Sequence, residues 1–222
     1  MLDLIKHLNF FNPENINAPI HIIGLGAIGS NVAELLTRLG VSKLNIYDFD
    51  TVNLHNLTNQ MFNYEDIGKK KTDGVERLCK AINPEIEIKK FDEGYTKQKL
   101  SGYVFLCVDN IEVRKQICEL NINNMFIKGI FDFRMGLKDA QHYYAKWNEQ
   151  DQKEKFIASM NFTHEEAKEN TPVSPCGTEL SVTPTVRTIV SAGVSNFINI
   201  INNEKPTNMI LVNPFANITI AQ

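Results

Sequence analysis

The sequence predicts an α/β fold, in which a mostly parallel sheet carries helices on both faces. Two observations support this fold class. Short apolar runs of strand length alternate along the chain with longer segments of helical periodicity. The first run, residues 20–23, opens directly into a glycine-rich loop that precedes a helical segment. Strand, helix and strand in alternation are typical of parallel sheets that are covered on both sides.

The first part of the chain supplies most of the predicted elements. Helices are expected where apolar residues recur every three or four positions, and Gly40 and Asn83-Pro84 end two of them. Strands are expected where apolar residues alternate or run continuously, and the continuous run at 103–108 indicates a strand buried on both faces. In chain order the predicted elements are a short helix within 1–18, strand 20–23, helix 28–39, strand 43–48, helix 71–82, strand 86–91, strand 103–108, helix 111–122 and strand 125–131.

The last third of the chain predicts a crossover, a closing helix and short strands. Residues 140–146 fit a further strand, and the polar segment 148–183 is interpreted as a partly helical crossover loop on the surface. Thr183-Pro184 begins a helix that runs to about Ile201, because proline is favoured in a first helical turn. Two short antiparallel strands are expected at 209–212 and 217–220. The chain is interpreted as a single domain with three parts: 20–136, 148–183 and 184–222.

Composition limits the class of protein. A chain of 222 residues with 43% hydrophobic residues can bury one sizeable core. The net charge of -3 argues against a nucleic-acid partner, because phosphate backbones are bound by basic surfaces. We expect no membrane partner and a cytoplasmic location, since the chain has neither an apolar run of about 18 residues nor a signal peptide. The four cysteines form no Cys-x-x-Cys pair, so no zinc site is expected.

The loop Gly24-Leu25-Gly26-Ala27-Ile28-Gly29 joins the first strand to the first helix. Glycines permit a tight turn and a close approach of the backbone to phosphate, and the helix N-terminus offers free N–H groups to the anion. Gly24, Gly26 and Gly29 therefore predict a Rossmann-like nucleotide site, the alternative being a turn that binds nothing. Asp48 ends the second strand, where an acid hydrogen-bonds a ribose hydroxyl. These features fit NAD and ATP alike, so a dehydrogenase remains open.

A series of short motifs after the second strand narrows the choice. In order they are Asp48-Phe49-Asp50-Thr51-Val52, Asn56-Leu57-Thr58-Asn59-Gln60, Gly68-Lys69-Lys70-Lys71, Ile82-Asn83-Pro84, Asp109-Asn110 followed by Arg114, and Phe133-Arg134-Met135-Gly136. The series resembles the adenylating domain of the ThiF/MoeB/HesA family, the bacterial relatives of ubiquitin-activating enzymes. The resemblance covers residues 20 to about 136, and it marks that segment as the nucleotide-binding core.

The resemblance implies an ATP-dependent adenylyltransferase that activates the C-terminal carboxylate of a small ubiquitin-like or sulfur-carrier protein. It also implies ATP and Mg²⁺ as cofactors and a homodimer as the assembly. By the same resemblance, Asp48 binds the ribose, Lys71 reaches the phosphates as a point charge and catalyses the reaction, and Asp109 holds the magnesium ion. Asn56 and Gln60 would contact the phosphates or the metal shell.

Several of these residues also have simpler local interpretations. Lys71 could be one solvated lysine in a run of three, and Asp109 could cap the helix that begins at residue 111. The two amide side chains could be ordinary turn residues. Arg114 is interpreted as a structural residue near the helix start, and Asp50 as a support of the nucleotide network.

One position departs from the family pattern in a way that bears on activity. Asn59 stands where the family has an arginine that neutralises the phosphates. Lys69, Lys70 or a partner chain could restore the charge, but residues 1–37 contain no arginine that could reach across a dimer. A catalytically impaired relative that binds nucleotide or partner is therefore the alternative function, followed by an NAD-dependent oxidoreductase.

Cys176 is the candidate for a second half-reaction. It lies in the crossover shortly before Thr183-Pro184, as the cysteine of thioester-forming family members does, and a thiolate there could take the acyl group from the adenylate. The alternative is a cysteine without a role. Among the remaining residues, His142 and His164 are interpreted as surface residues and Trp147 as packing.

Overall fold

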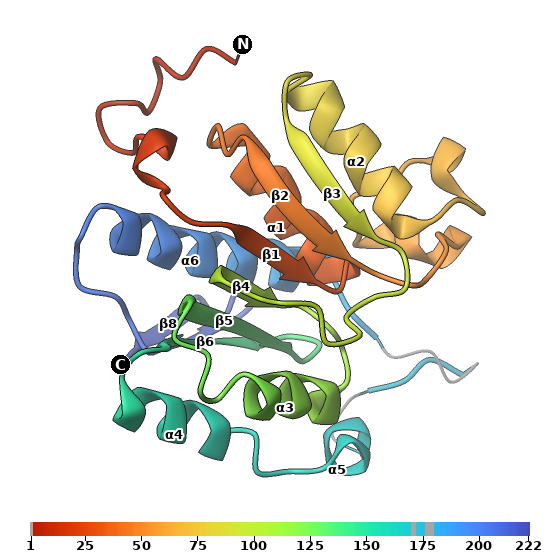
Figure 1. Cartoon of the computed structure of the whole chain (residues 1–222). Helices are drawn as coiled ribbons and strands as arrows, with labels where there is room; N and C mark the ends of the chain where they lie inside the picture. Colours follow the sequence, from red (N-terminus) through yellow and green to blue (C-terminus); the bar gives the residue numbers. More distant parts are fainter. Residues whose placement is uncertain (1, 170–171, 176–179) are drawn as a thin grey trace.

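The computed structural model describes residues 2–169, 172–175 and 180–222, and it consists of a central sheet with helices on both faces (Figure 1). The sheet has eight strands in the order β3-β2-β1-β4-β5-β6-β7-β8. Their bounds are β1 Ile20–Ile23, β2 Lys43–Tyr47, β3 Glu87–Phe91, β4 Gly102–Leu106, β5 Ile127–Met135, β6 Ala140–Lys146, β7 Met209–Asn213 and β8 Ile218–Ala221. The predicted α/β class is confirmed.

The strand order contains a reversal that positions the site. Strands β3, β2, β1, β4 and β5 are parallel, and β6, β7 and β8 continue the sheet in antiparallel pairing. From β1 the chain moves outward through β2 to β3, then returns to the other side of β1 as β4. The loops after β1 and β4 therefore leave in opposite directions, and sheets of this kind bind ligands in the crevice between such loops.

The helices divide between the two faces of the sheet. On one face lie α1 (Ala27–Arg38), α2 (Lys71–Ile82) and α6 (Thr183–Ile201), and on the other lie α3 (Ile111–Leu120) and α4 (Gln150–Ala158). The crossover adds the short α5 (His164–Glu169), and 3₁₀ helices η1 (Pro13–Asn15), η2 (Leu54–Thr58) and η3 (Tyr64–Asp66) lie in the loops. Within the described ranges, no helix is long and apolar enough to cross a membrane.

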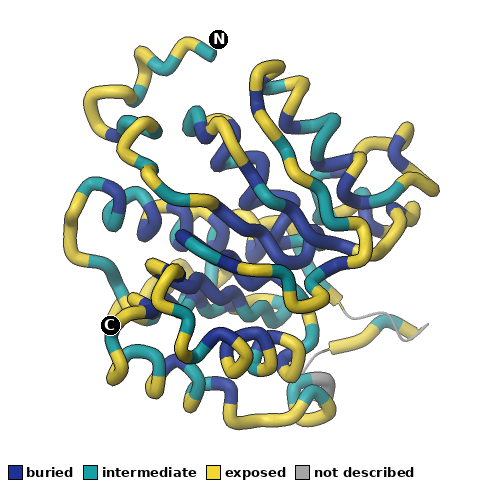
Figure 2. The backbone as a smooth tube through the Cα atoms, viewed as in Figure 1, coloured by how far each residue is buried: buried dark blue, intermediate teal, exposed yellow. Residues whose placement is uncertain are grey.

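Two apolar clusters, one on each face, hold these layers together, and the central strands between them are buried (Figure 2). Phe105 and Phe131 stack with ring centroids 4.6 Å apart, and Phe197 of α6 meets both rings edge-on. Aromatic pairs of this kind add about 0.5–1.5 kcal/mol beyond the burial of area. The apolar face of α6 therefore serves the core. On the other face, Trp147 donates its indole N–H to the carbonyl of Asn121 at 2.8 Å, so the predicted packing role of Trp147 is confirmed.

The N-terminal segment differs from the sequence-based expectation. The prediction of a short helix within residues 1–18 is wrong, because this segment forms turns at 5–10 and the single-turn η1. Asn12 caps η1 by accepting a hydrogen bond from the N–H of Glu14 at 3.0 Å, and Pro13 occupies the first helical turn. These residues start a new turn where the predicted helix should end, and an isolated segment this short gains too few hydrogen bonds to offset helix nucleation.

His142 also lies in a different place from the one predicted. It is fully buried on β6 rather than at the surface. Asn196 donates its amide N–H to Nε2 of His142 at 3.2 Å, so the proton of the neutral ring lies on Nδ1 and is donated to the carbonyl of Asp132 at 3.1 Å. Burial lowers the pKa of His142 from 6.5 to about 4, in keeping with this neutral form.

Candidate nucleotide-binding site

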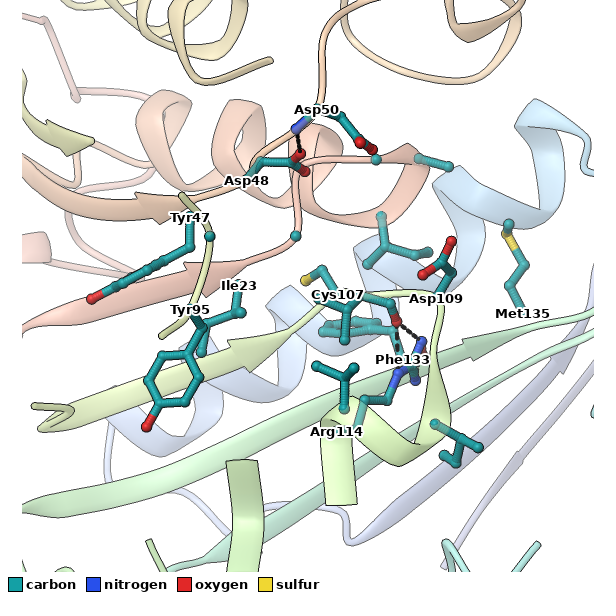
Figure 3. Close-up of a pocket in the computed structure, with 18 of the residues that line it drawn as sticks. Ile23, Tyr47, Asp48, Asp50, Tyr95, Cys107, Asp109, Arg114, Phe133 and Met135 are labelled. Atoms are coloured by element: carbon teal, nitrogen blue, oxygen red, sulfur yellow. Dashed lines mark hydrogen bonds between the residues drawn. The ribbon is translucent and has the colours of Figure 1, made fainter. Parts of the chain in front are cut away.

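A cavity of about 570 Å³ opens at the carboxyl ends of the central parallel strands, where the strand order reverses. Figure 3 shows Asp48 and Asp50 on one side of it and Asp109 on the other, with Arg114 beneath the loop that carries Asp109. Of the residues predicted for the site, those that line the cavity are Gly24, Gly26, Asp48, Asp50, Gln60, Lys71 and Asp109. The fold therefore gathers side chains that are up to 85 positions apart in the sequence into one crevice.

The three glycines of the loop differ in what an added side chain would meet. Gly24 has φ +90°, and a Cβ there would lie 2.7 Å from the backbone nitrogen of Val108. A Cβ on Gly29 would lie 1.8 Å from the carbonyl oxygen of Gly24, so a side chain at 29 would push the turn apart. At Gly26 a Cβ would meet nothing within 4 Å, although this residue borders the cavity. Protein packing explains Gly24 and Gly29, whereas Gly26 leaves open space next to the first turn of α1.

Asp48 holds the glycine loop from the neighbouring strand. Its carboxylate is buried and accepts hydrogen bonds from the backbone N–H of Leu25 at 2.6 Å and from that of Asp50 at 2.9 Å. Charge-assisted bonds to backbone N–H groups are among the strong ones. The carboxylate therefore fixes the loop after β1 against the loop after β2, and its position at the cavity wall suits a ribose hydroxyl.

Lys71 begins α2, and its ammonium group forms an ion pair with Asp50 at 2.8 Å. The lysine side chain is only 9% exposed, whereas that of Asp50 is 50% exposed. A backbone hydrogen bond also joins the two residues, because the N–H of Lys71 donates to the carbonyl of Asp50 at 3.0 Å. A buried cation held at the cavity wall by one half-exposed carboxylate can exchange part of that contact for phosphate oxygens. Its neighbour Lys70 is half-buried and donates to the carbonyl of Phe49 at 3.2 Å in a solvent-exposed hydrogen bond.

The loop after β4 presents Asp109 to the cavity and leaves helix capping to the next residue. Asn110 is the N-cap of α3, and its side chain accepts hydrogen bonds from the N–H groups of Glu112 and Val113. The carboxylate of Asp109 is exposed and borders the cavity. Arg114 braces the loop from below: it is buried, donates to the carbonyl of Val108 and forms an ion pair with Asp132 at 2.8 Å. The structural role predicted for Arg114 is confirmed.

The donors at this position suit a magnesium ion that is bound together with a nucleotide. Mg²⁺ is usually held by one or two carboxylates and completes its shell with phosphate oxygens and water. Asp109 offers one exposed carboxylate, and Asp50 lies at the opposite wall of the same cavity (Figure 3). Across the described ranges, no group of three His, Cys, Asp or Glu residues could hold a metal ion. The protein part of the site thus fits an ion that arrives with phosphate.

Of the polar residues in and just after η2, some hydrogen-bond within the turn and others line the cavity. Asn56 is buried, accepts from the N–H of Asn53 at 2.8 Å in a capping box, and does not belong to the described residues that line the cavity. Gln60 does line it, and its carbonyl oxygen Oε1 is buried without a hydrogen-bond partner among the described residues. Unpaired buried acceptors are rare and call for an explanation. Asn59, which stands in place of the family arginine, donates to Oγ of Ser181 at 2.7 Å.

Two parts of the cavity wall were not predicted from the sequence. One is an aromatic end formed by Tyr47, Phe49 and Tyr95, in which Tyr47 is buried and stacks on Phe91 with centroids 4.3 Å apart. The apolar character of residues 47 and 49 was visible in the sequence, but the approach of residue 95 depends on the turn after β3. The other part is formed by Arg134, Phe162 and His164.

The prediction that His164 lies at the surface is wrong, because its ring lines the cavity and its Nδ1 is buried. A signal for its placement exists in the sequence: Thr163 and Glu166 have the spacing of a capping box, which marks a helix start at residue 164.

The cysteines fall into two groups. Cys79, Cys107 and Cys118 are buried free thiols, and burial raises the pKa of each above its ordinary value. These three are therefore unreactive core residues. The predicted nucleophile Cys176 lies outside the described residues.

The fold and the cavity together define a Rossmann-like α/β domain in which a glycine loop, the buried Asp48, a buried lysine and an exposed acid gather at the switch point of the sheet. Residues 15–220 match the sequence profile of the ThiF family. The chain belongs to this family.

Individual relatives match more limited regions. Over 125 residues the chain is 36% identical to ubiquitin-like modifier-activating enzyme 5 of Dictyostelium discoideum, a match that covers 48% of this chain and 33% of that enzyme. The enzyme of the same name from Oryza sativa subsp. japonica is 38% identical over 116 residues, covering 43% and 27% of the two chains. The chain thus spans about a third or less of the length of these enzymes.

Solved structures show the same fold at low sequence identity. The selenomethionine form of PaaA superposes with a TM-score of 0.72 at 15% identity, covering 99% of this chain and 68% of that one. Escherichia coli MccB, in a crystal structure with ATP, superposes with a TM-score of 0.69 at 18% identity, covering 95% and 64%.

Proposed function

We propose that this protein is an ATP-dependent adenylyltransferase that activates the C-terminal carboxylate of a small ubiquitin-like or sulfur-carrier protein. The observation that carries the proposal is the convergence of the glycine loop, Asp48, Lys71 and Asp109 on one cavity at the switch point of the sheet. Family membership and the names of the relatives support it. The groups at the cavity match the ribose and the phosphates of ATP and the metal ion that accompanies them.

The residues divide the work of the reaction as follows. Asp48 accepts a ribose hydroxyl, and the N-terminus of α1 beside Gly26 offers its N–H groups to phosphate. A carboxylate oxygen of the carrier attacks the α-phosphorus; the new P–O bond forms as the bond to the bridging oxygen breaks, and pyrophosphate leaves with the electron pair. Lys71 stabilises the negative charge on the phosphates. Asp109 would hold Mg²⁺, which supplies further charge neutralisation when bound. Gln60 would contact the phosphates or the metal's water shell through its unpaired oxygen.

A thioester step would follow at Cys176. The thiolate attacks the acyl carbon of the adenylate, the thioester bond forms, and AMP leaves with the electrons of the broken acyl–oxygen bond. The position of Cys176 in the crossover supports this step. Cys176→Ala should abolish a carrier adduct that reducing agents cleave, while pyrophosphate exchange remains. Persistence of a reducible adduct in the variant would refute the role of Cys176.

The second candidate function is a catalytically impaired relative that binds nucleotide or a partner without turnover. The observation that favours it is the hydrogen bond from Asn59 to Ser181, which gives this position a structural partner and no charge. Lys71 and Asp109 at the cavity favour turnover instead.

Exchange of labelled pyrophosphate into ATP separates these functions. The assay is run with the full chain, Mg²⁺ and a panel of purified ubiquitin-like and sulfur-carrier proteins, each compared with a form that lacks its last two residues. Exchange that depends on an intact carrier C-terminus supports the adenylyltransferase. ATP binding without exchange for any carrier supports the impaired relative, and NAD binding without ATP binding overturns both. Sedimentation velocity of the same sample tests the proposed homodimer.

A further inference from the structure

The end of the cavity formed by Arg134, Phe162 and His164 has no part in holding the nucleotide as proposed above. Its framework is rigid. Arg134 donates to Oδ2 of Asp132 at 2.7 Å and to the carbonyl and hydroxyl oxygens of Ser159 at 2.6 and 2.8 Å. Its guanidinium carbon lies 5.8 Å from the centre of the Phe162 ring. The last residues of β5 and the segment between α4 and α5 are thus joined into one wall.

His164 is held in this wall by the start of α5. The N–H of Thr163 donates to Oε2 of Glu166 at 2.7 Å, and the N–H of Glu166 donates to Oγ1 of Thr163 at 3.1 Å. This reciprocal pair is a capping box, and it sets the backbone of α5 from its first residue, His164. The imidazole borders the cavity, and its Nδ1 is buried without a hydrogen-bond partner among the described residues. A buried ring nitrogen without a partner is costly unless a ligand supplies one.

The surroundings of His164 suit a peptide backbone better than phosphate. Met135, Phe162 and Ala167 give this end of the cavity an apolar lining. Three of the five N–H donors of Arg134 are bound by Asp132 and Ser159, which holds the guanidinium against the cavity wall. A peptide tail offers both an N–H donor and a carbonyl acceptor, so it can satisfy either tautomer of an imidazole nitrogen.

We propose that His164 is a specificity-determining residue that hydrogen-bonds the backbone of the substrate's C-terminal tail, next to the carboxylate that becomes adenylated. This assignment rests on the proposed function. The capping box starts α5 at His164, and the tail supplies the partner that Nδ1 lacks.

The test uses two non-hydrolysable probes and needs no knowledge of the carrier. One is 5′-O-(glycylglycylsulfamoyl)adenosine, which mimics an adenylated dipeptide, and the other is 5′-O-sulfamoyladenosine, which lacks the peptide. Glycine supplies backbone groups and no side chain, so the difference between the two affinities reports backbone recognition. Calorimetric titration of the full chain should show tighter binding of the dipeptide probe. His164→Ala should weaken that probe by about 2- to 12-fold, the equivalent of one hydrogen bond, and leave the shorter probe within twofold.

Two further variants make the test specific. His164→Asn places a carboxamide group near the position of Nδ1 and should recover most of the affinity for the dipeptide probe. Glu165→Ala changes an exposed neighbour on the same helix and should alter neither affinity. If the wild type binds both probes but His164→Ala loses nothing, the assignment of His164 is overturned and the nucleotide site stands. If the wild type binds neither probe, the proposed function fails and the assignment with it.

Discussion

Gly26 and Gly29 lie three residues apart on the same loop, and the structure predicts opposite consequences for an added methyl group. At Gly26, which has a negative φ, a Cβ meets nothing within 4 Å. At Gly29 it would lie 1.8 Å from the carbonyl oxygen of Gly24, which belongs to the backbone and cannot rotate away. Gly26→Ala should therefore fold normally and fail in ligand binding, whereas Gly29→Ala should lose stability.

The sizes of the two effects follow from packing. An added methyl group that forces its surroundings to shift costs typically about 1–3 kcal/mol. For Gly29→Ala this cost falls on the folded protein and corresponds to a decrease in Tm of roughly 2–12 °C for a domain of this size. For Gly26→Ala the same cost falls on the complex, since the methyl group occupies the approach to the first turn of α1, and ATP binding should weaken about 5- to 150-fold.

Thermal unfolding and ATP titration of both variants test whether Gly29 serves the folded protein and Gly26 serves ligand binding. The expected pattern is an unchanged Tm with weak ATP binding for Gly26→Ala, and a decreased Tm for Gly29→Ala. Equal losses of Tm would show that the open space at Gly26 does not exist in solution. Full ATP affinity in Gly26→Ala would show that phosphate does not approach this part of the loop.

Two further predictions concern charge. Lys71→Met should reduce pyrophosphate exchange about 10²- to 10³-fold, because it removes a cation fixed at the cavity wall. Lys70→Met, at a lysine that does not line the cavity, should change the exchange rate less than threefold. Equal effects of the two substitutions would contradict the assignment. Stability should decrease between pH 7 and 5 because burial lowers the pKa of His142 from 6.5 to about 4, so the unfolded chain binds a proton that the folded chain excludes. His142 should account for about 2 kcal/mol of the loss in the free energy of unfolding, which urea unfolding at both pH values measures. The pKa of His21 is also lowered to about 4, so His21 adds a contribution of its own. His142→Gln should remove the contribution of His142 and leave that of His21.

The parts of the site that the sequence predicted are those governed by local chemistry. Gly24 and Gly29 serve a turn whose shape depends on residues close in sequence, and Asp48 and Asp109 follow strands whose carboxyl ends must meet in a parallel sheet. The α/β class follows from the same local periodicity. The strand–loop–helix pattern thus predicted the place of the glycine loop and Asp48, whereas the assignment of Asp109 to the site came from the family resemblance.

Other features depend on tertiary contacts that local patterns do not encode. Asn56 and Gln60 are both amides in one turn, but only Gln60 faces the cavity. Asp109 and Asn110 both have capping side chains, and only the backbone path after β4 makes Asn110 the cap. His142 is buried because β6 passes beneath α6, where Asn196 donates a hydrogen bond to its ring nitrogen.

The connection between η2 and α6 has a consequence for the order of folding. Asn59 donates to Ser181 across 122 residues of sequence, and Thr183 donates to the carbonyl of Thr58 across 125. Contacts between such distant segments repay the entropy of loop closure only after the intervening sheet is in place. The bond from Thr183 is also exposed to water, so it opens at a lower free energy than the buried strands. The rim of the cavity is thus assembled last and released first, long before the central sheet itself unfolds.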